Sequence, residues 1–191
     1  MNKRVRTLSI NEMNILISSS ALISTIMLLI FLDSPFCVIA ALIVYCIFFF
    51  WIIKLLWMMF YSKWILKLPG KSILRTRKLI EVHIGDLAKN EASKFLSINS
   101  KSVLVAHQLK KDAVFYSWHR SPEKYKEFFG DCADIVTVEG FERFAQLFRN
   151  KSYKPEEVEY PLTRVYVFWN KLDGHTIAKL ERHVKRGRSA A

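Results

Sequence analysis

Histidines and cysteines are the residues of this 191-residue chain best suited to chemistry, and they are few and scattered. Trp118-His119-Arg120 and Asp173-Gly174-His175 each place a titratable imidazole beside polar loop residues, where a general acid or base could work. Turn residues and helix caps explain both tripeptides equally well. No recognisable nucleophile motif accompanies either one. We therefore expect no enzyme and name no catalytic residue.

Metal and cofactor sites need particular spacings of their ligands, and these spacings are missing. Cys37 and Cys46 fall inside a long apolar stretch, which leaves Cys132 as an ordinary thiol in the polar part of the chain. No local group of cysteines and histidines has zinc spacing. The glycines are isolated and form no phosphate-binding loop. We expect no metal ion and no cofactor.

A near-continuous apolar block extends from residue 15 to residue 61. Asp33-Ser34-Pro35 divides it into two uncharged spans, 15–32 and 36–53, each about 27 Å long as a helix. A bilayer has a hydrocarbon core of about 30 Å, and proline cannot continue a helix. The block therefore predicts a two-helix transmembrane hairpin. Two alternatives fit the sequence less well. A signal peptide would need a cleavage site after the first span, and none is present. Core helices of a soluble protein would not be apolar on nearly every face.

Small residues recur at four-residue spacing in both spans, as helices that approach closely require. They are Ser20 and Ser24, Ala21 and Thr25, and Cys37 and Ala41. Such residues would hold the two helices of the hairpin together, or would pair the hairpin with that of a second copy. In the second case the protein would be a homo-oligomer.

Basic residues flank the hairpin on both sides, whereas the short turn has none. Because cytoplasmic loops carry the excess of lysine and arginine, both termini are expected to be cytoplasmic. Aromatic and lysine side chains at the end of the second span would lie in the headgroup region and contact lipids. These predicted membrane-interface residues are Trp51, Lys54, Trp57, Tyr61, Lys63, Trp64 and Lys67.

The formal net charge of +12 does not indicate a nucleic-acid-binding domain. Acidic and basic residues balance between residues 79 and 178, so the excess lies beside the membrane spans and in the C-terminal segment. Anionic lipids attract such juxtamembrane charge. The C-terminal basic residues are Lys179, Arg182, Lys185, Arg186 and Arg188. They would form a solvated helix end, or a contact with the membrane surface or with an anionic partner.

Leu68-Pro69-Gly70 separates the membrane segment from the polar part of the chain. The predicted segments are a basic cytoplasmic head (1–14), the transmembrane hairpin with its interfacial segment (15–68), a basic linker (69–78) and a cytoplasmic domain with a basic C-terminal helix (79–191). Strands are predicted at 79–84, 102–107, 113–118, 133–138 and 164–169, with 102–107 and 113–118 as a possible hairpin. Helices are predicted at 87–96, 122–129, 141–148 and 175–185. Strands and helices alternate, which predicts a mixed α/β or α+β domain.

Aromatic residues are abundant in this domain, and their spacing first predicts a core. On the predicted helix 141–148, Phe141, Phe144, Ala145 and Phe148 fall on one face. If some of these rings are exposed, a protein-binding surface explains them better, because aromatic residues dominate interface hot spots.

The layout of the whole chain resembles the entry-exclusion (surface-exclusion) proteins of I-group conjugative plasmids. The resemblance lies in the basic head Met1-Asn2-Lys3-Arg4-Val5-Arg6, the hairpin from Ile15 to Tyr61 and the aromatic-rich remainder. It implies a multi-pass protein of the bacterial inner membrane that recognises the incoming conjugative transfer apparatus and blocks redundant plasmid uptake. The alternatives are a membrane-anchored nucleic-acid-binding or secretion-scaffold protein, and a membrane-tethered enzyme using His119 or His175.

Overall fold

The computed structural model describes residues 8–31, 33–83, 92–148 and 159–189, without the side chains of 92–94 and 186–189. Lys3, Arg4 and Arg6 of the predicted head, and the start of the predicted helix 87–96, therefore lie outside the described residues. The chain divides into two compact units, Met1–Trp57 and Met58–Ala191.

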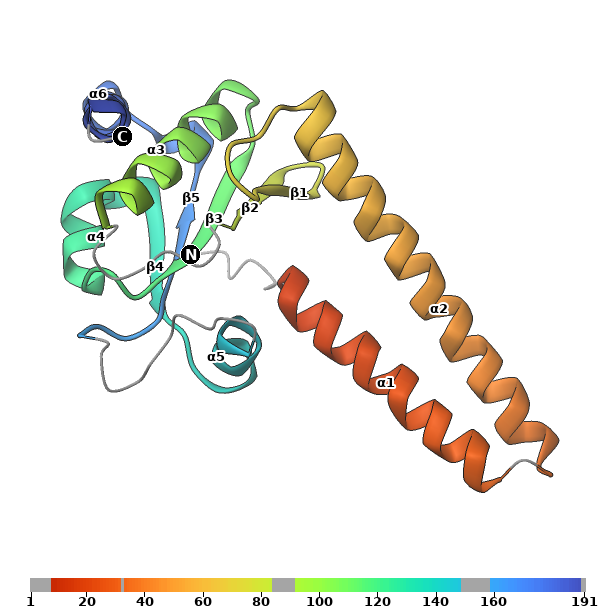
Figure 1. Cartoon of the computed structure of the whole chain (residues 1–191). Helices are drawn as coiled ribbons and strands as arrows, with labels where there is room; N and C mark the ends of the chain where they lie inside the picture. The colour runs from red at the N-terminus through yellow and green to blue at the C-terminus, as the bar shows by residue number, and fades with distance from the viewer. Residues whose placement is uncertain (1–7, 32, 84–91, 149–158, 190–191) are drawn as a thin grey trace. The chain divides into compact units, whose positions relative to one another are not determined.

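The first unit is a pair of long apolar helices, α1 (Ile10–Ile30) and α2 (Pro35–Phe60), that run side by side in opposite directions (Figure 1). A capping box starts α1, in which the Ser9 hydroxyl accepts from the Glu12 N–H and the Glu12 carboxylate accepts from the Ser9 N–H. Both helices are long and apolar enough to span a membrane, as predicted. Each is longer than its predicted span, and α2 continues into a π-helical turn, η1 (Tyr61–Ile65).

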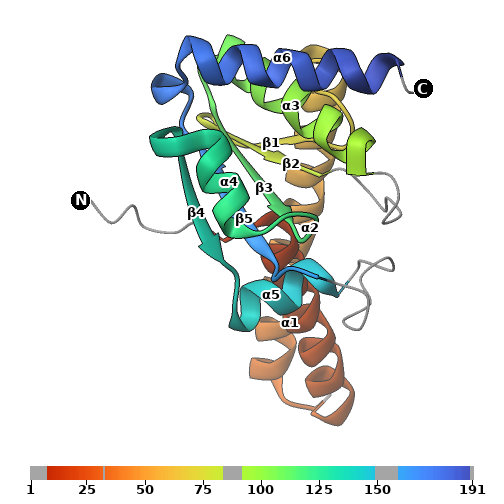
Figure 2. The same cartoon turned by 90° about the vertical axis from the view of Figure 1, so that its left-hand side faces the viewer.

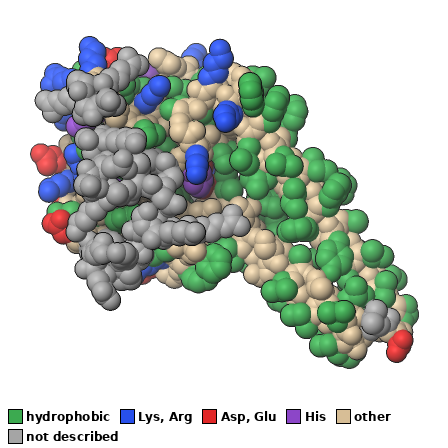
Figure 3. Space-filling model, viewed as in Figure 1, with side chains coloured by type: hydrophobic (Ala, Val, Ile, Leu, Met, Phe, Trp, Pro, Cys, Tyr) green, Lys and Arg blue, Asp and Glu red, His purple; other side chains and the backbone are tan. Residues whose placement is uncertain are grey.

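Two polar contacts join these helices. Thr25 Oγ1 lies 2.7 Å from Tyr45 Oη, and Trp51 Nε1 donates to Asn14 Oδ1 at 2.9 Å. Ala41 is buried, in agreement with close packing of small residues, whereas Ser20 is exposed and its hydroxyl donates to the Leu16 carbonyl. Hydrophobic side chains are spread along the whole visible face of both helices (Figure 3).

The second unit contains a five-stranded mixed sheet in the order β1-β2-β3-β5-β4. Its strands are β1 (Ile73–Thr76), β2 (Leu79–Val82), β3 (Asp112–Ser117), β4 (Ala133–Thr137) and β5 (Thr163–Val167). The β2–β3 pair is parallel and the other three pairs are antiparallel. Four α-helices accompany the described strands: α3 (Ala92–Gln108), α4 (Pro122–Phe129), α5 (Gly140–Leu147) and α6 (Gly174–Ser189). The short 3₁₀ turns η3 (Gly130–Cys132) and η5 (Trp169–Lys171) complete the unit.

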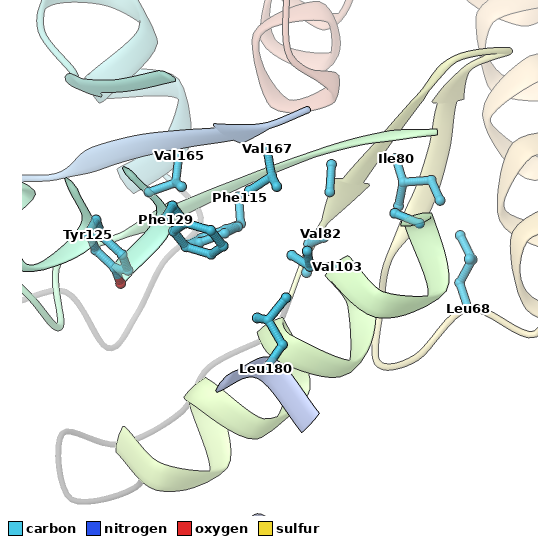
Figure 4. Close-up of a cluster of buried hydrophobic side chains, with 12 residues drawn as sticks. Leu68, Ile80, Val82, Val103, Phe115, Tyr125, Phe129, Val165, Val167 and Leu180 are labelled. Atoms are coloured by element: carbon cyan, nitrogen blue, oxygen red, sulfur yellow. The ribbon is translucent and has the colours of Figure 1, made fainter. Parts of the chain in front are cut away.

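The hydrophobic core lies on one face of this sheet. Alternate residues of β2, β3 and β5 point to this face and meet α3 and α4, while α6 packs along α3 (Figure 2). Figure 4 shows the rings of Phe115, Tyr125 and Phe129 gathered beneath Val165 and Val167. All five side chains are at most 4% exposed.

The predicted strand 102–107 is wrong, because these residues belong to α3. Val103-Leu104-Val105-Ala106 reads as a continuous apolar run, which suits a buried strand or a buried helix. The predicted hairpin is absent for the same reason: β3 pairs in parallel with β2 after the α3 crossover. The predicted linker 69–78 also contains a strand, β1.

Most other predicted elements are confirmed. Ser121 caps α4 by accepting from the Lys124 N–H, Pro122 starts the helix, and Gly130 follows it at φ +53°. The predictions for β2, β3, β4, β5, α5 and α6 agree with the observed elements to within a few residues.

Candidate interaction surface

Helix α5 has its aromatic side outward and its polar side inward, which is the reverse of an ordinary amphipathic helix. Phe141, Phe144 and Phe148 are 41%, 51% and 64% exposed, whereas Glu142 is only 6% exposed. Ala145 is buried as well, so the prediction that it lies on one face with the three phenylalanines is wrong, as is the prediction that these rings form a core. The three phenylalanines, which we call the Phe ridge, therefore do not contribute to a core within the described structure.

The phenylalanine rings form a continuous row. The centroids of Phe141 and Phe144 are 6.4 Å apart, and those of Phe144 and Phe148 are 5.3 Å apart. Their spacing of three and four residues places them along one side of the helix. The result is a compact aromatic ridge on the exposed side of α5.

A buried ion pair holds α5 in this orientation. Arg164 Nη1 donates to both Glu142 carboxylate oxygens, at 3.0 and 3.2 Å, and the Tyr116 hydroxyl donates to Oε1 at 2.9 Å. Tyr116 on β3 and Arg164 on β5 are directly opposite each other in the strand register. Both side chains therefore reach Glu142 from the sheet face opposite the hydrophobic core.

The environment of Tyr116 keeps its hydroxyl protonated. Burial raises the pKa of this phenol well above its usual value, and the neighbouring Glu142 carboxylate raises it further. The hydroxyl thus remains a hydrogen-bond donor to Glu142 at any physiological pH.

Edge strand β4 lies beside this arrangement. Val136 pairs with Arg164 in the register, so its side chain is on the same sheet face as the ion pair, and it is 40% exposed. Asp134 on the same strand and Glu139 just before α5 are exposed and acidic. Arg143 within α5 is exposed and basic, so the chain around the Phe ridge carries apolar groups together with charges of both signs.

The predicted membrane-interface residues are placed along α2 and just after it. The Lys54 ammonium lies 5.5 Å from the Trp51 ring centroid, and Trp57 is 63% exposed. Further along, Trp64 is 66% exposed and stacks on Phe60. Three further predicted residues follow α2: Tyr61 and Lys63 in η1, and Lys67, which has φ +50°.

The segment after η1 belongs to the folded domain rather than to a free linker. Ser62 Oγ accepts from the Leu74 N–H at 2.7 Å, and the Ser62 carbonyl accepts from the Leu68 N–H at 3.0 Å. Leu68 is part of the core. Gly70 has φ +62°, a backbone conformation that favours glycine, and a Cβ there would lie 3.3 Å from Ile98 Cγ2.

The predicted basic tail lies on α6 and does not gather with the Phe ridge. Lys179 lies 5.8 Å above the Phe128 ring, and Arg182 and Lys185 are exposed. The side chains of Arg186 and Arg188 lie outside the described residues. Leu180 on the same helix is buried against the core, so α6 is a packed element with basic groups on its outer side.

The two histidines considered for catalysis have different surroundings. The His119 ring packs on Phe95 and Trp118, and burial lowers its pKa. His175 is exposed in the first turn of α6, next to the helix cap formed by Asp173. Cys132 donates its thiol hydrogen to the Lys171 carbonyl. Among the described residues, no three His, Cys, Asp or Glu side chains group as metal ligands.

The sequence contained the signal for the Phe ridge but not for its orientation. The spacing of Phe141, Phe144 and Phe148 identified one helix face, and only the ion pair between Glu142 and Arg164 shows which side is inward. The structure therefore shows a helix and mixed-sheet domain with an exposed aromatic ridge, in a chain that also has two apolar helices long enough to span a membrane. Comparisons with protein-family models, curated proteins and solved structures found no match.

Proposed function

We propose that this protein is a membrane-anchored, non-enzymatic recognition protein whose Phe ridge binds a protein partner. The observation that carries the proposal is the outward orientation of Phe141, Phe144 and Phe148, maintained by a buried ion pair on the other side of α5. A folded protein does not gain stability from three exposed phenylalanines in a row, so a binding role accounts for them.

The membrane anchor is the hairpin of α1 and α2. Apolar side chains along both helices are exposed, including Leu22 at 63% and Phe50 at 69%, which suits lipid contact. The flanking lysines and arginines favour cytoplasmic termini and a multi-pass topology in the bacterial inner membrane. Trp51, Lys54 and Trp57 would then lie at the cytoplasmic headgroups.

The make-up of the Phe ridge favours a protein partner over lipid, because aromatic rings dominate the hot spots of protein interfaces. The ridge has exposed charges of both signs close to it in the chain, Glu139 just before α5 and Arg143 within it. A protein with a hydrophobic groove and a rim of mixed charge would complement both the rings and these groups. The contrary result would be that the Phe ridge binds anionic vesicles and that a soluble competitor protein does not reduce this binding.

The sharpest form of the proposal is entry exclusion. In this role the protein sits in the inner membrane of a recipient cell and binds a component of the incoming conjugative apparatus, so that a related plasmid is not taken up again. The resemblance in layout supports this role together with the Phe ridge.

Plasmid uptake tests the proposal directly. The full-length chain is expressed alone in recipient cells, and uptake of a related conjugative plasmid is compared with uptake of an unrelated one. We expect selective loss of the related plasmid. Equal uptake of both plasmids, with the protein shown to be present in the membrane fraction, would rule out exclusion.

A further inference from the structure

The two edge strands of the sheet differ in how well they are protected from pairing with another strand. Strand β1, at one edge, has a bulge between Leu74 and Thr76 and carries Arg75 and Arg77. A bulge and basic residues at an edge hinder the addition of a further strand. Strand β4, at the other edge (Figure 2), pairs with β5 in a continuous register and contains no lysine, arginine or proline. Strand β4 is therefore the edge better suited to accept another strand.

The backbone of β4 presents hydrogen-bonding groups on the side away from β5. The Val138 N–H donates to the Leu162 carbonyl at 2.8 Å, and the Phe168 N–H donates to the Cys132 carbonyl at 2.9 Å. Because bonded and non-bonded pairs alternate along antiparallel strands, the even-numbered residues of β4 bond to β5 and the odd-numbered residues point their N–H and C=O groups outward. The outward residues are Ala133, Ile135 and Thr137. Among the described residues, no backbone group pairs with these outward groups.

The two faces of β4 carry different side chains. Val136 pairs in register with Arg164, which binds Glu142 of α5, so Asp134 and Val136 lie on the sheet face that carries α5. Both side chains are exposed. Ile135 lies on the other face, where it packs against the core. A strand added beside β4 would therefore meet a carboxylate on one face and an apolar side chain on the other.

Charge decides which kind of strand fits this edge. Residues 128–142 include four acidic side chains and no lysine or arginine. The exposed ones are Asp131, Asp134 and Glu139. Arg164 on the neighbouring strand is paired with Glu142, and the exposed Arg143 and Lys171 lie on other elements, α5 and η5. The edge therefore favours a basic strand, whereas a second copy of β4 would bring the same acidic stretch against itself.

We propose that β4 accepts an extended, basic segment of the partner protein as an additional antiparallel strand. This inference rests on the proposed recognition of a protein partner and names the way in which the partner binds. The outward N–H and C=O groups of β4 pair with the backbone of the added segment, and side chains at alternate positions give specificity. A lysine or arginine of the segment lies opposite Asp134, and an apolar side chain lies opposite Ile135.

The test uses a defined peptide, acetyl-Lys-Val-Lys-Val-Lys-Val-Lys-amide, which is titrated into the full-length chain in uncharged detergent micelles. Hydrogen exchange of the backbone amides, followed by NMR, is the readout. We expect the peptide to slow exchange at Ala133, Ile135 and Thr137 and to leave Val136, which is already bonded to β5, unchanged. The peptide in which glutamate replaces every lysine should bind at least about tenfold more weakly. Equally tight binding of the glutamate peptide would overturn the assignment to a basic segment.

Methylation of the peptide backbone separates strand pairing from ionic attraction. In the proposed arrangement the valines lie opposite the outward residues of β4, so their N–H groups point toward β4 and those of the lysines point away. N-methylation of the valines should abolish the slowing of exchange, whereas N-methylation of the lysines should preserve it. The same slowing with both methylated peptides would mean that the peptide is held by its charge alone, and the proposal would be wrong.

Two positions of the chain complete the test. T137P removes an outward N–H without removing a bond to β5, so it should abolish the effect of the peptide at Ile135 with little change in melting temperature. T137V keeps the N–H and is the matched control. D134K should weaken the lysine peptide at least about fivefold.

Undiminished binding in T137P or D134K would overturn the proposal. So would slow exchange of the same amides that develops with rising protein concentration in the absence of peptide, because it would assign the edge to a second copy of the chain. Plasmid uptake plays no part in these measurements, so a failure of strand addition is read separately from a failure of the proposed function.

Discussion

Arg164 and Glu142 form a two-pronged ion pair in which one guanidinium nitrogen lies 3.0 and 3.2 Å from the two carboxylate oxygens. The Arg164 side chain is 19% exposed and that of Glu142 is 7% exposed. This contact joins strand β5 to α5 and turns the Phe ridge outward. It therefore links the stability of the domain to the surface proposed for recognition.

Removing the Glu142 carboxylate should destabilise the domain strongly. E142A leaves the Arg164 guanidinium and the Tyr116 hydroxyl without this partner, and we expect a loss of about 3 kcal/mol in the free energy of unfolding. E142Q should lose less, because its amide oxygen still accepts from Tyr116. Denaturant unfolding of the purified chain measures both values, and a cycle with R164A isolates the coupling between the two side chains. A change below about 0.5 kcal/mol for E142A would mean that the pair does not hold α5.

Acid should destabilise the domain through His119. Burial lowers the folded-state pKa of this imidazole below its ordinary value of 6.5, so the unfolded chain binds more protons as the pH falls. Its contribution to stability is therefore present above about pH 6.5 and is lost as the pH falls through the folded-state pKa. Melting temperatures in a series of buffers measure this slope. H119Q, which cannot titrate, should show a smaller loss on acidification, and an unchanged slope would assign the acid sensitivity to other groups.

Topology can be tested by labelling single cysteines. In a background with Cys37, Cys46 and Cys132 replaced, D33C should react with a membrane-impermeant maleimide in spheroplasts, because the turn between α1 and α2 would face the periplasm. E127C, at an exposed position on α4, should react only after the membrane is opened. The reverse pattern would place the domain on the periplasmic side.

The sequence predicted most closely the helices that begin and end with characteristic capping residues. Helix α4 is the best case, since Ser121, Pro122 and Gly130 mark its cap, first turn and end. Helix α3 was missed in part because Asn99 occupies its core side. A polar residue at that position hides the repeat formed by Phe95, Val103 and Ala106, and the remaining apolar run resembles a strand.

Tertiary contacts explain what local patterns could not. Arg75 made the segment before β2 look like a charged linker, yet its side chain is 8% exposed and pairs with the buried carboxylate of Glu81. The order of the strands and the parallel β2–β3 pair also depend on contacts between distant segments. The same holds for the Phe ridge, since the ion pair that turns α5 joins residues 142 and 164.

The most direct test of the central claim is plasmid uptake into recipients that carry a variant of the Phe ridge. F144S replaces a ring that is 51% exposed, so it should leave folding and membrane levels nearly unchanged. E127A, an exposed substitution on α4 at the core side of the sheet, is the matched control. We expect the wild-type chain and E127A to exclude the related plasmid, and F144S to raise its uptake by at least about tenfold, as loss of a hot-spot residue would. If F144S recipients contain the protein in their membranes and still exclude the plasmid as well as the wild type, the Phe ridge is not the recognition surface.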